Sequence, residues 1–335
     1  MAYRDHHLPY RLPLIKEKLP VSAGGDAVGL YWTMFKNPSS EVPGVETYYA
    51  KNITYAYRQL VRHTNLLETS VPRIFIEESC VEKALPIFKD AGIESLVRVY
   101  ADTVGHKTWQ NLTLRLQFLD HPDFKDCRYR FSSDDDIWFM SNAAGKIFDW
   151  QAFADGLDTR DSEFYCTLYA LVHVESLLST NYIVDTDFAS NSERMRSLCR
   201  DVWGEIPDSI DMVNGCFFGI RSGTALRRYM DFYNAYHTSY VYDELFLRLF
   251  VDYTNISHEN ILNTPYAEDQ EEHPFSFAMI YAYEGLEETY PNLLFYHNLC
   301  VTEYEGVLTG NVGTELGDPS KMINRYLVDF IERFR

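Results

Sequence analysis

Apolar and polar positions recur with two different spacings along residues 27–140. Short apolar runs are typical of buried strands, and apolar residues three or four positions apart are typical of helices. The predicted strands are 27–34, 72–76, 96–100 and 129–133, and the predicted helices are 52–68, 81–91 and 109–119. Alternating strands and helices favour right-handed crossovers and a mainly parallel sheet flanked by helices. The pattern therefore predicts an α/β fold.

The second half of the chain has a mixed pattern. It predicts a strand over 211–220 and helices over 164–178, 242–251 and 321–334. Residues 1–25 resemble an irregular arm, and no repeat or low-complexity linker divides the remainder. We therefore expect one domain over 26–335, with an α/β half (26–140) and a mixed half (141–335).

The composition narrows the class of ligand. With 46% hydrophobic and 15% aromatic residues, the chain can build a large core, so disorder is not expected. Its 49 acidic and 30 basic residues give a formal charge of −19. Binding to nucleic acid or to anionic lipid requires a basic face, so this charge argues against both. It favours a neutral substrate, or one whose charge is met by a metal ion.

The cysteines and the apolar runs bear on the compartment. The six cysteines are scattered and form no Cys-x-x-Cys pair, which argues against a zinc or redox motif. Several lie in apolar runs, as Cys216 does, and are expected to be buried thiols. The sequence shows no apolar stretch long enough for a membrane span and no signal-peptide core. We therefore expect a cytoplasmic protein without a membrane span.

The acidic triplet Asp134-Asp135-Asp136 directly follows the fourth predicted strand and precedes the apolar run 137–139. A hard divalent cation relieves the repulsion among adjacent carboxylates and can also bind a diphosphate. Ligands of open α/β sheets sit at the carboxyl ends of strands. On an extended backbone, Asp134 and Asp136 would point to the same side. The pattern thus predicts a Mn²⁺ or Mg²⁺ site on those two residues. An acidic surface turn or helix cap is the alternative, against which the apolar flanks argue.

The triplet and its flanks resemble the Asp-x-Asp motif of GT-A glycosyltransferases. Four other segments resemble those enzymes in the same chain order, so that the resemblance covers about residues 27–250. They are Tyr31-Trp32-Thr33, Asn52-Ile53-Thr54-Tyr55-Ala56, Val213–Ile220 and Tyr242-Asp243-Glu244, with the basic Arg115 before the triplet. The resemblance implies a GT-A fold, a nucleotide-sugar donor, a glycan or other hydroxyl acceptor, and a divalent cation.

The chain also departs from those enzymes. Its triplet has three aspartates, so the metal-binding pair can shift by one position, and Glu244 stands where glutamine is commoner. The late His-x-x-Gly-x-x-Lys-Pro pattern of one retaining family is absent from the sequence. His297 is a candidate third metal ligand, the alternative being a structural histidine beside a strand.

The resemblance also implies roles for individual residues. The candidate donor contacts are Tyr31, Thr33, Tyr55, Lys107, Arg115, Asp134, Asp135, Asn214 and Gly215. Asp243 or Glu244 would be the general base of an inverting enzyme, or would position the sugar in a retaining one. Asp243 could equally have no catalytic role and be an acidic residue that the helix dipole favours at a helix N-terminus. The tyrosines of 229–242 suit either an acceptor groove or a packing surface.

Two other functions remain open from the sequence. A sugar-nucleotide pyrophosphorylase has the same fold and metal requirement, but it should carry a glycine-rich basic loop after the first strand. This chain has Lys36-Asn37-Pro38 there. The other candidate is a non-catalytic interaction protein, in which the triplet is only a surface turn.

Overall fold

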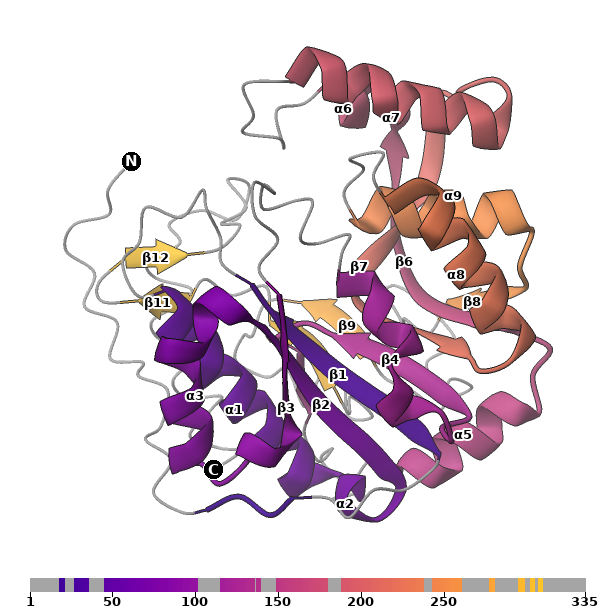
Figure 1. The fold of residues 1–335 in the computed structure, drawn as a ribbon. Coiled ribbons are helices and arrows are strands. Elements are labelled where there is room, and N and C mark those ends of the chain that lie inside the picture. Colours follow the sequence, from indigo (N-terminus) through magenta and orange to yellow (C-terminus); the bar gives the residue numbers. More distant parts are fainter. Residues whose placement is uncertain are drawn as a thin grey trace.

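A seven-stranded sheet forms the centre of the molecule (Figure 1). The computed structural model describes residues 18–21, 27–35, 45–101, 115–135, 137–139, 149–179, 188–237, 243–260, 277–280, 295–298, 302–304 and 307–309. The strand order is β3-β2-β1-β4-β7-β6-β8. Four of the six pairings are parallel, whereas β7 runs antiparallel to both β4 and β6. The prediction of an α/β fold with a mainly parallel sheet is confirmed.

The bounds of the sheet strands follow from their backbone pairing. They are β1 (Val28–Met34), β2 (Ser70–Glu77), β3 (Val97–Tyr100), β4 (Tyr129–Ser133), β6 (Phe164–His173), β7 (Ser209–Arg221) and β8 (His258–Asn260). Smaller sheets are formed by β5 (Ile137–Phe139), β9 (Phe277–Ile280) and β10 (Phe295–Asn298), and by β11 (Thr302–Tyr304) and β12 (Val307–Thr309).

Helices cover both faces of the large sheet. The α-helices are α1 (Val45–His63), α2 (Leu66–Thr69), α3 (Val81–Asp90), α5 (Trp150–Asp158), α6 (Val174–Ser179), α7 (Phe188–Trp203), α8 (Thr224–Tyr236) and α9 (Asp243–Thr254). The 3₁₀ helices are η1 (Glu78–Cys80), η2 (Glu94–Leu96), η3 (Arg115–Asp120) and η4 (Pro122–Phe124). None of the helices in the described ranges combines the length and apolar character needed to cross a membrane.

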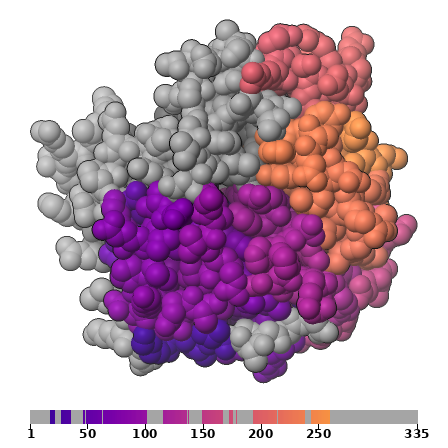
Figure 2. Space-filling view, in the orientation of Figure 1, coloured from indigo at the N-terminus to yellow at the C-terminus, as the bar shows by residue number. Residues whose placement is uncertain are grey.

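The core has two parts, one on each face of the sheet. On the first face, α1, α3 and α5 pack against inward residues such as Leu30 and Trp32 of β1. On the second face, η3, α7, α8 and α9 pack against residues such as Tyr31 and Phe75. Successive residues of β1 thus enter opposite cores, as the two-residue period of a strand requires. Figure 2 shows the surface of residues 70–101 and 115–135 beside that of α8 and α9.

Most predicted elements are confirmed. The four strands of the first half and the strand over 211–220 are present, and Gly92 follows α3 with the positive φ of 76° that favours glycine there. The helix predicted over 242–251 corresponds to α9. Of the helix over 109–119 only its last part is described, as η3, and 321–334 lies outside the described residues. All five described cysteines are buried, as expected; Cys300 is not among them.

The helix predicted over 164–178 is wrong. The segment forms β6 down to His173 and becomes helical only in α6. In β6, Tyr165 belongs to the first core, whereas Phe164 and Cys166 belong to the second. A strand buried on both faces is apolar throughout, and periodicity cannot distinguish such a run from a buried helix. His173, expected on an apolar helix, is the exposed last residue of the strand.

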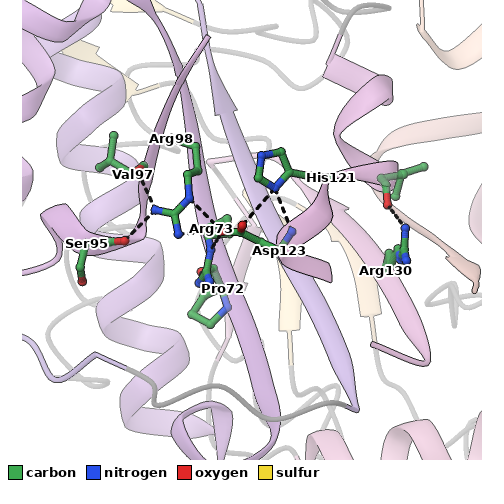
Figure 3. Close-up of polar contacts among 9 residues, drawn as sticks. Pro72, Arg73, Ser95, Val97, Arg98, His121, Asp123 and Arg130 are labelled. Atoms are coloured by element: carbon green, nitrogen blue, oxygen red, sulfur yellow. Dashed lines mark hydrogen bonds and ion pairs between the residues drawn. The ribbon is translucent and has the colours of Figure 1, made fainter. Parts of the chain in front are cut away.

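The segment from η3 to η4 is bound to the edge of the sheet through Asp123 (Figure 3). Its Oδ2 accepts hydrogen bonds from Nε of Arg73 on β2 and, at 2.8 Å, from Nε of Arg98 on β3. His121 caps the N-terminus of η4: its Nδ1 accepts a hydrogen bond from the backbone N–H of Asp123 at 3.2 Å. Burial raises the pKa of Asp123, but the two arginines together lower it below its ordinary value of 3.8. The carboxylate is therefore ionised at neutral pH.

We expect Asp123→Asn to lower the free energy of unfolding by about 1 kcal/mol at pH 7, because a partly exposed ion pair contributes roughly that much. The folded-state pKa lies below the unfolded value, so this stabilisation is complete above that value. It is lost as the pH falls through the folded-state pKa. Urea unfolding at pH 7 and pH 3 should therefore show a difference that shrinks in acid. Asp126→Asn, an exposed neighbour, should show little effect at either pH; equal stability of Asp123→Asn and wild type at pH 7 would contradict the prediction.

Candidate functional site: an arginine between two carboxylates

Arg115, the first residue of η3, joins four elements at the carboxyl end of β4. Its Nη1 donates to Oδ1 of Asp134, which directly follows β4. Its Nη2 donates to Oδ2 of Asp243, the first residue of α9, at 2.5 Å, and to the backbone oxygen of Gly215 on β7 at 2.9 Å. Arg115 is only 7% exposed. The guanidinium therefore links both halves of the chain below the surface.

The pairing of β4 with β7 brings these groups together. The antiparallel register sets Ser133 opposite Phe217, and the ladder continues where the Asp134 N–H donates to the Cys216 oxygen at 2.8 Å. Asp134 is thereby placed beside Gly215. Asp243 lies in the first turn of α9, where the helix dipole favours an acidic residue.

Gly215 is required where the strand approaches the ion pair. A Cβ at this position would lie 2.6 Å from Asp243 Oδ2 and 3.1 Å from Arg115 Nη2. Its N–H donates to Oε1 of Glu244 at 3.3 Å. The main chain of Gly215 therefore contacts the arginine through its oxygen and a second carboxylate through its nitrogen.

Negative charge exceeds positive charge at the site. Burial alone would lower the pKa of Arg115, but Asp134 and Asp243 together raise it above its ordinary value, so the guanidinium stays charged. Among the described residues, Asp134, Asp135, Asp243 and Glu244 supply four carboxylates and Arg115 one cation, a net charge of −3 for these five when all are ionised. Such an excess favours binding of a divalent cation with oxygen ligands.

Asp134 and Asp135 lie in a turn that follows β4, not on an extended strand. The Ile137 N–H approaches the Asp134 oxygen at 3.4 Å, and the chain turns from β4 into β5 of a different sheet. Asp134 contacts Arg115, whereas Asp135 Oδ2 accepts a hydrogen bond from Asn52 Nδ2 of α1 at 2.8 Å. The two carboxylates therefore contact elements on opposite faces of the large sheet, Asp134 on the face of η3 and Asp135 on the face of α1. The strand assumed for pairing Asp134 with Asp136 does not continue through Asp135, and Asp136 lies outside the described residues, so a metal site on that pair stays a prediction.

Three residues predicted to contact the donor, Tyr31, Thr33 and Tyr55, are wholly or partly buried. Tyr31 is fully buried among aromatic rings, so no ligand reaches its ring in this structure, and its hydroxyl donates to the Arg115 oxygen at 3.2 Å. Thr33 is partly buried near the carboxyl end of β1, and its Oγ1 has no hydrogen-bond partner among the described residues. Tyr55 is buried on α1 at 3% exposure. Of these three, Thr33 alone retains appreciable exposure.

The remaining predicted residues are only partly described. Lys107 and Asp136 lie outside the described residues. The backbone of Asn214 pairs with Thr167, and that of His297 pairs with Ile137, the residue after Asp136. Neither side chain is described. Among the described side chains, no group of three or more histidine, cysteine, aspartate or glutamate residues could hold a metal ion. The metal ligands Asp134, Asp136 and His297 therefore stay predictions.

Asn52 is a site residue whose role the sequence did not indicate. It lies on α1 with 5% exposure and donates to Asp135. Its signal is a polar amide among the buried positions of an amphipathic helix, since buried polar side chains are nearly always hydrogen-bonded. The tyrosine-rich α8 is a packing surface at its described positions: Tyr229, Phe232 and Tyr233 are all buried.

Comparison with known proteins gives structural neighbours but no family. No protein-family model matches the chain, and no curated protein matches it. Mouse xyloside xylosyltransferase 1 (apo form) has 9% identity and a TM-score of 0.37, covering 81% of this chain and 98% of that chain. The bifunctional glycosyltransferase WbbM (apo structure) has 9% identity and a TM-score of 0.41, covering 84% and 47%. The mannosyltransferase Ktr4p from S. cerevisiae has 11% and 0.33, covering 76% and 69%. All three are glycosyltransferases by name, but at these scores the likeness carries no argument.

We expect Gly215→Ala to lower the free energy of unfolding by about 1–3 kcal/mol, because the new methyl group overlaps the buried ion pair. Gly156→Ala is the matched control: it lies in α5, and its Cβ would meet nothing within 4 Å. That change should be neutral or should stabilise by about 0.5–1 kcal/mol. Urea unfolding followed by circular dichroism measures both. A Gly215→Ala protein as stable as the wild type would show that the ion pair is not packed against this glycine.

Proposed function

We propose that the protein is a metal-dependent glycosyltransferase that moves a sugar from a nucleoside-diphosphate donor to a glycan or other hydroxyl acceptor. The observation that carries the proposal is the clamp of Arg115 between Asp134 and Asp243, at the carboxyl end of β4 and beside the Gly215 backbone. Three segments whose sequences resemble GT-A enzymes supply Asp134, Gly215 and Asp243, and all three of these residues contact Arg115.

The charge of the site supports a diphosphate ligand bound through a cation. Four carboxylates against one guanidinium would repel a free diphosphate. A Mn²⁺ or Mg²⁺ ion held by the acidic triplet, with His297 as the predicted third ligand, fits this donor set of oxygens and one imidazole. When bound, the ion supplies Lewis-acid stabilisation of the charge that develops on the leaving diphosphate. Arg115 adds a fixed positive charge at the same place.

The two acidic residues that begin α9 have different surroundings, which suggests different roles. Asp243 is buried, and its Oδ2 is held by Arg115 at 2.5 Å, so we assign it to orienting the arginine. Glu244 is half-buried and lies against the Gly215 N–H. It is therefore the better candidate to meet substrate, as the base of an inverting reaction or as the group that positions the sugar in a retaining one.

The first test is thermal unfolding with a panel of nucleoside diphosphates, with and without Mn²⁺. Ligand that binds the native state raises Tm by mass action, by about 3–6 °C at one hundred times Kd for a chain of this size. We expect one nucleoside diphosphate to give a Mn²⁺-dependent shift, which Asp136→Ala should abolish. Asp126→Ala, an exposed aspartate in the turn after η4, is the matched control and should keep the full shift.

Other outcomes of the same experiment separate the alternatives. A Tm shift with a nucleoside triphosphate but with no diphosphate would favour the pyrophosphorylase. No shift with any nucleotide, together with an Asp136→Ala protein that behaves as the wild type, would favour a surface turn in a non-catalytic protein.

Glu244→Gln and Asp243→Asn should separate chemistry from structure. We expect Glu244→Gln to lower kcat for donor turnover by about a hundredfold or more with little change in Tm, because it removes a group that acts in the reaction. Asp243→Asn removes one charge from a buried pair, and should lower the free energy of unfolding by about 1–3 kcal/mol as well as the activity. Hydrolysis of the sugar nucleotide whose diphosphate binds, followed beside thermal unfolding, measures both effects. Full activity of Glu244→Gln would remove this residue from the proposed mechanism.

A further inference from the structure

The main chain at Arg115 is held by hydrogen bonds from side chains of other elements. Arg115 and Leu116 begin η3, a 3₁₀ helix, and such helices have poor intrinsic hydrogen-bond geometry. The hydroxyl of Tyr31 on β1 donates to the Arg115 oxygen at 3.2 Å. The hydroxyl of Tyr229 on α8 donates to the Leu116 oxygen, also at 3.2 Å. Two successive carbonyls are therefore fixed from two different elements.

Both tyrosines are themselves rigidly placed. Each is fully buried. The Tyr31 ring lies 5.6 Å from that of Phe75 and 6.1 Å from that of Phe124, and the Tyr229 ring lies 5.0 Å from that of Phe250. Burial raises the pKa of both hydroxyls above the ordinary value, so both keep the proton that they donate. Close packing of this kind leaves a ring few rotamers, which fixes the position of its hydroxyl.

The Arg115 side chain has no hydrogen-bonded support between its main chain and its tip. Its Nε is buried and has no hydrogen-bond partner among the described residues. Within the part of the chain that the structure describes, the guanidinium is held by Asp134, Asp243 and Gly215 at one end and by the main chain at the other. A displacement of the Arg115 main chain would therefore move the guanidinium relative to Asp134 and Asp243.

We infer that Tyr31 and Tyr229 are positioning residues, which hold the main chain of Arg115 and Leu116 so that the guanidinium spans Asp134 and Asp243. This inference rests on the proposed function in one respect only, namely that Arg115 is the positively charged residue of the donor site. It gives Tyr31 a part in that site without contact with a ligand, and it adds Tyr229, which lies on α8. The geometric part can be tested without any substrate.

Three variants that remove a single hydroxyl form a matched set. Tyr31→Phe and Tyr229→Phe each remove one bond to the η3 main chain and leave the ring in place. Tyr165→Phe removes a bond of the same kind elsewhere, because the buried Tyr165 donates its hydroxyl to the Ser162 oxygen at 2.6 Å. Any general effect of losing a buried hydroxyl should therefore appear in all three proteins.

The first readout is NMR of the guanidinium in full-length protein labelled with ¹³C,¹⁵N-arginine. Loss of one signal in Arg115→Lys assigns Arg115. We expect slow rotation about its Nε–Cζ bond in the wild type, because both Nη atoms are bound. Tyr31→Phe and Tyr229→Phe should each shift this signal and speed the rotation, whereas Tyr165→Phe should leave both unchanged. An unchanged Arg115 signal in the first two variants, or an equal change in the third, would overturn the inference.

The second readout is the affinity for Mn²⁺ with UDP, GDP, ADP or CDP, measured by calorimetry on the same proteins. For whichever probe binds the wild type, Tyr31→Phe and Tyr229→Phe should raise Kd about five- to tenfold, the effect of one hydrogen bond. Tyr165→Phe should leave Kd within about twofold. Equal Kd values in all four proteins would overturn the role in binding. If none of the four probes binds the wild type, the proposed function fails, and the NMR result still decides the geometric inference.

Discussion

The buried ion pair of Arg115 is the interaction on which the arrangement of the site depends. Moving an ionised guanidinium out of water costs several kcal/mol, and only carboxylates in direct contact offset that cost. Asp134 and Asp243 make those contacts from the end of β4 and the start of α9. The positions of β4, β7, α9 and η3 are therefore mutually dependent. If η3, α9 or the end of β4 moved, the buried guanidinium would lose one of its carboxylate partners.

In the proposed function, the same interaction is the reason that an anionic ligand would need a second cation. One guanidinium is already shared between two carboxylates, and two further carboxylates lie on Asp135 and Glu244. The chain as a whole carries a formal charge of −19, so the long-range field also opposes a diphosphate. In the proposed function, a divalent cation would offset most of this negative charge where the phosphates would bind. Metal dependence therefore belongs to the proposed function, and the charge count at the site is the physical argument that supports it.

The sequence predicted the elements better than it predicted their contacts. Strands β1 to β4 were found because helices separate them, and each is short and apolar. Strand β6 was mistaken for a helix because β7 and β8 flank it and cores cover both its faces, which removes the alternation that marks a strand. At the site, Arg115, Asp134, Gly215, Asp243 and Glu244 were each identified, but their mutual contacts were not. Those contacts depend on the antiparallel pairing of β4 with β7, which no local pattern contains.

Two expectations at the site differ from the described geometry for the same physical reason. The acidic triplet was treated as an extension of β4, although the chain turns after Ser133, and Tyr31 was expected to face a ligand, although it is buried behind Arg115. The period of a strand indicates which side of the sheet a residue faces, but not what lies on that side. Gly215 shows why the two kinds of information cannot be separated. Because Gly215 has no side chain, the ion pair fits beside it. Its carbonyl accepts a hydrogen bond from Arg115, and its N–H donates one to Glu244. A change at this residue therefore alters packing and charge placement together, and stability and activity must be measured on the same protein to distinguish them.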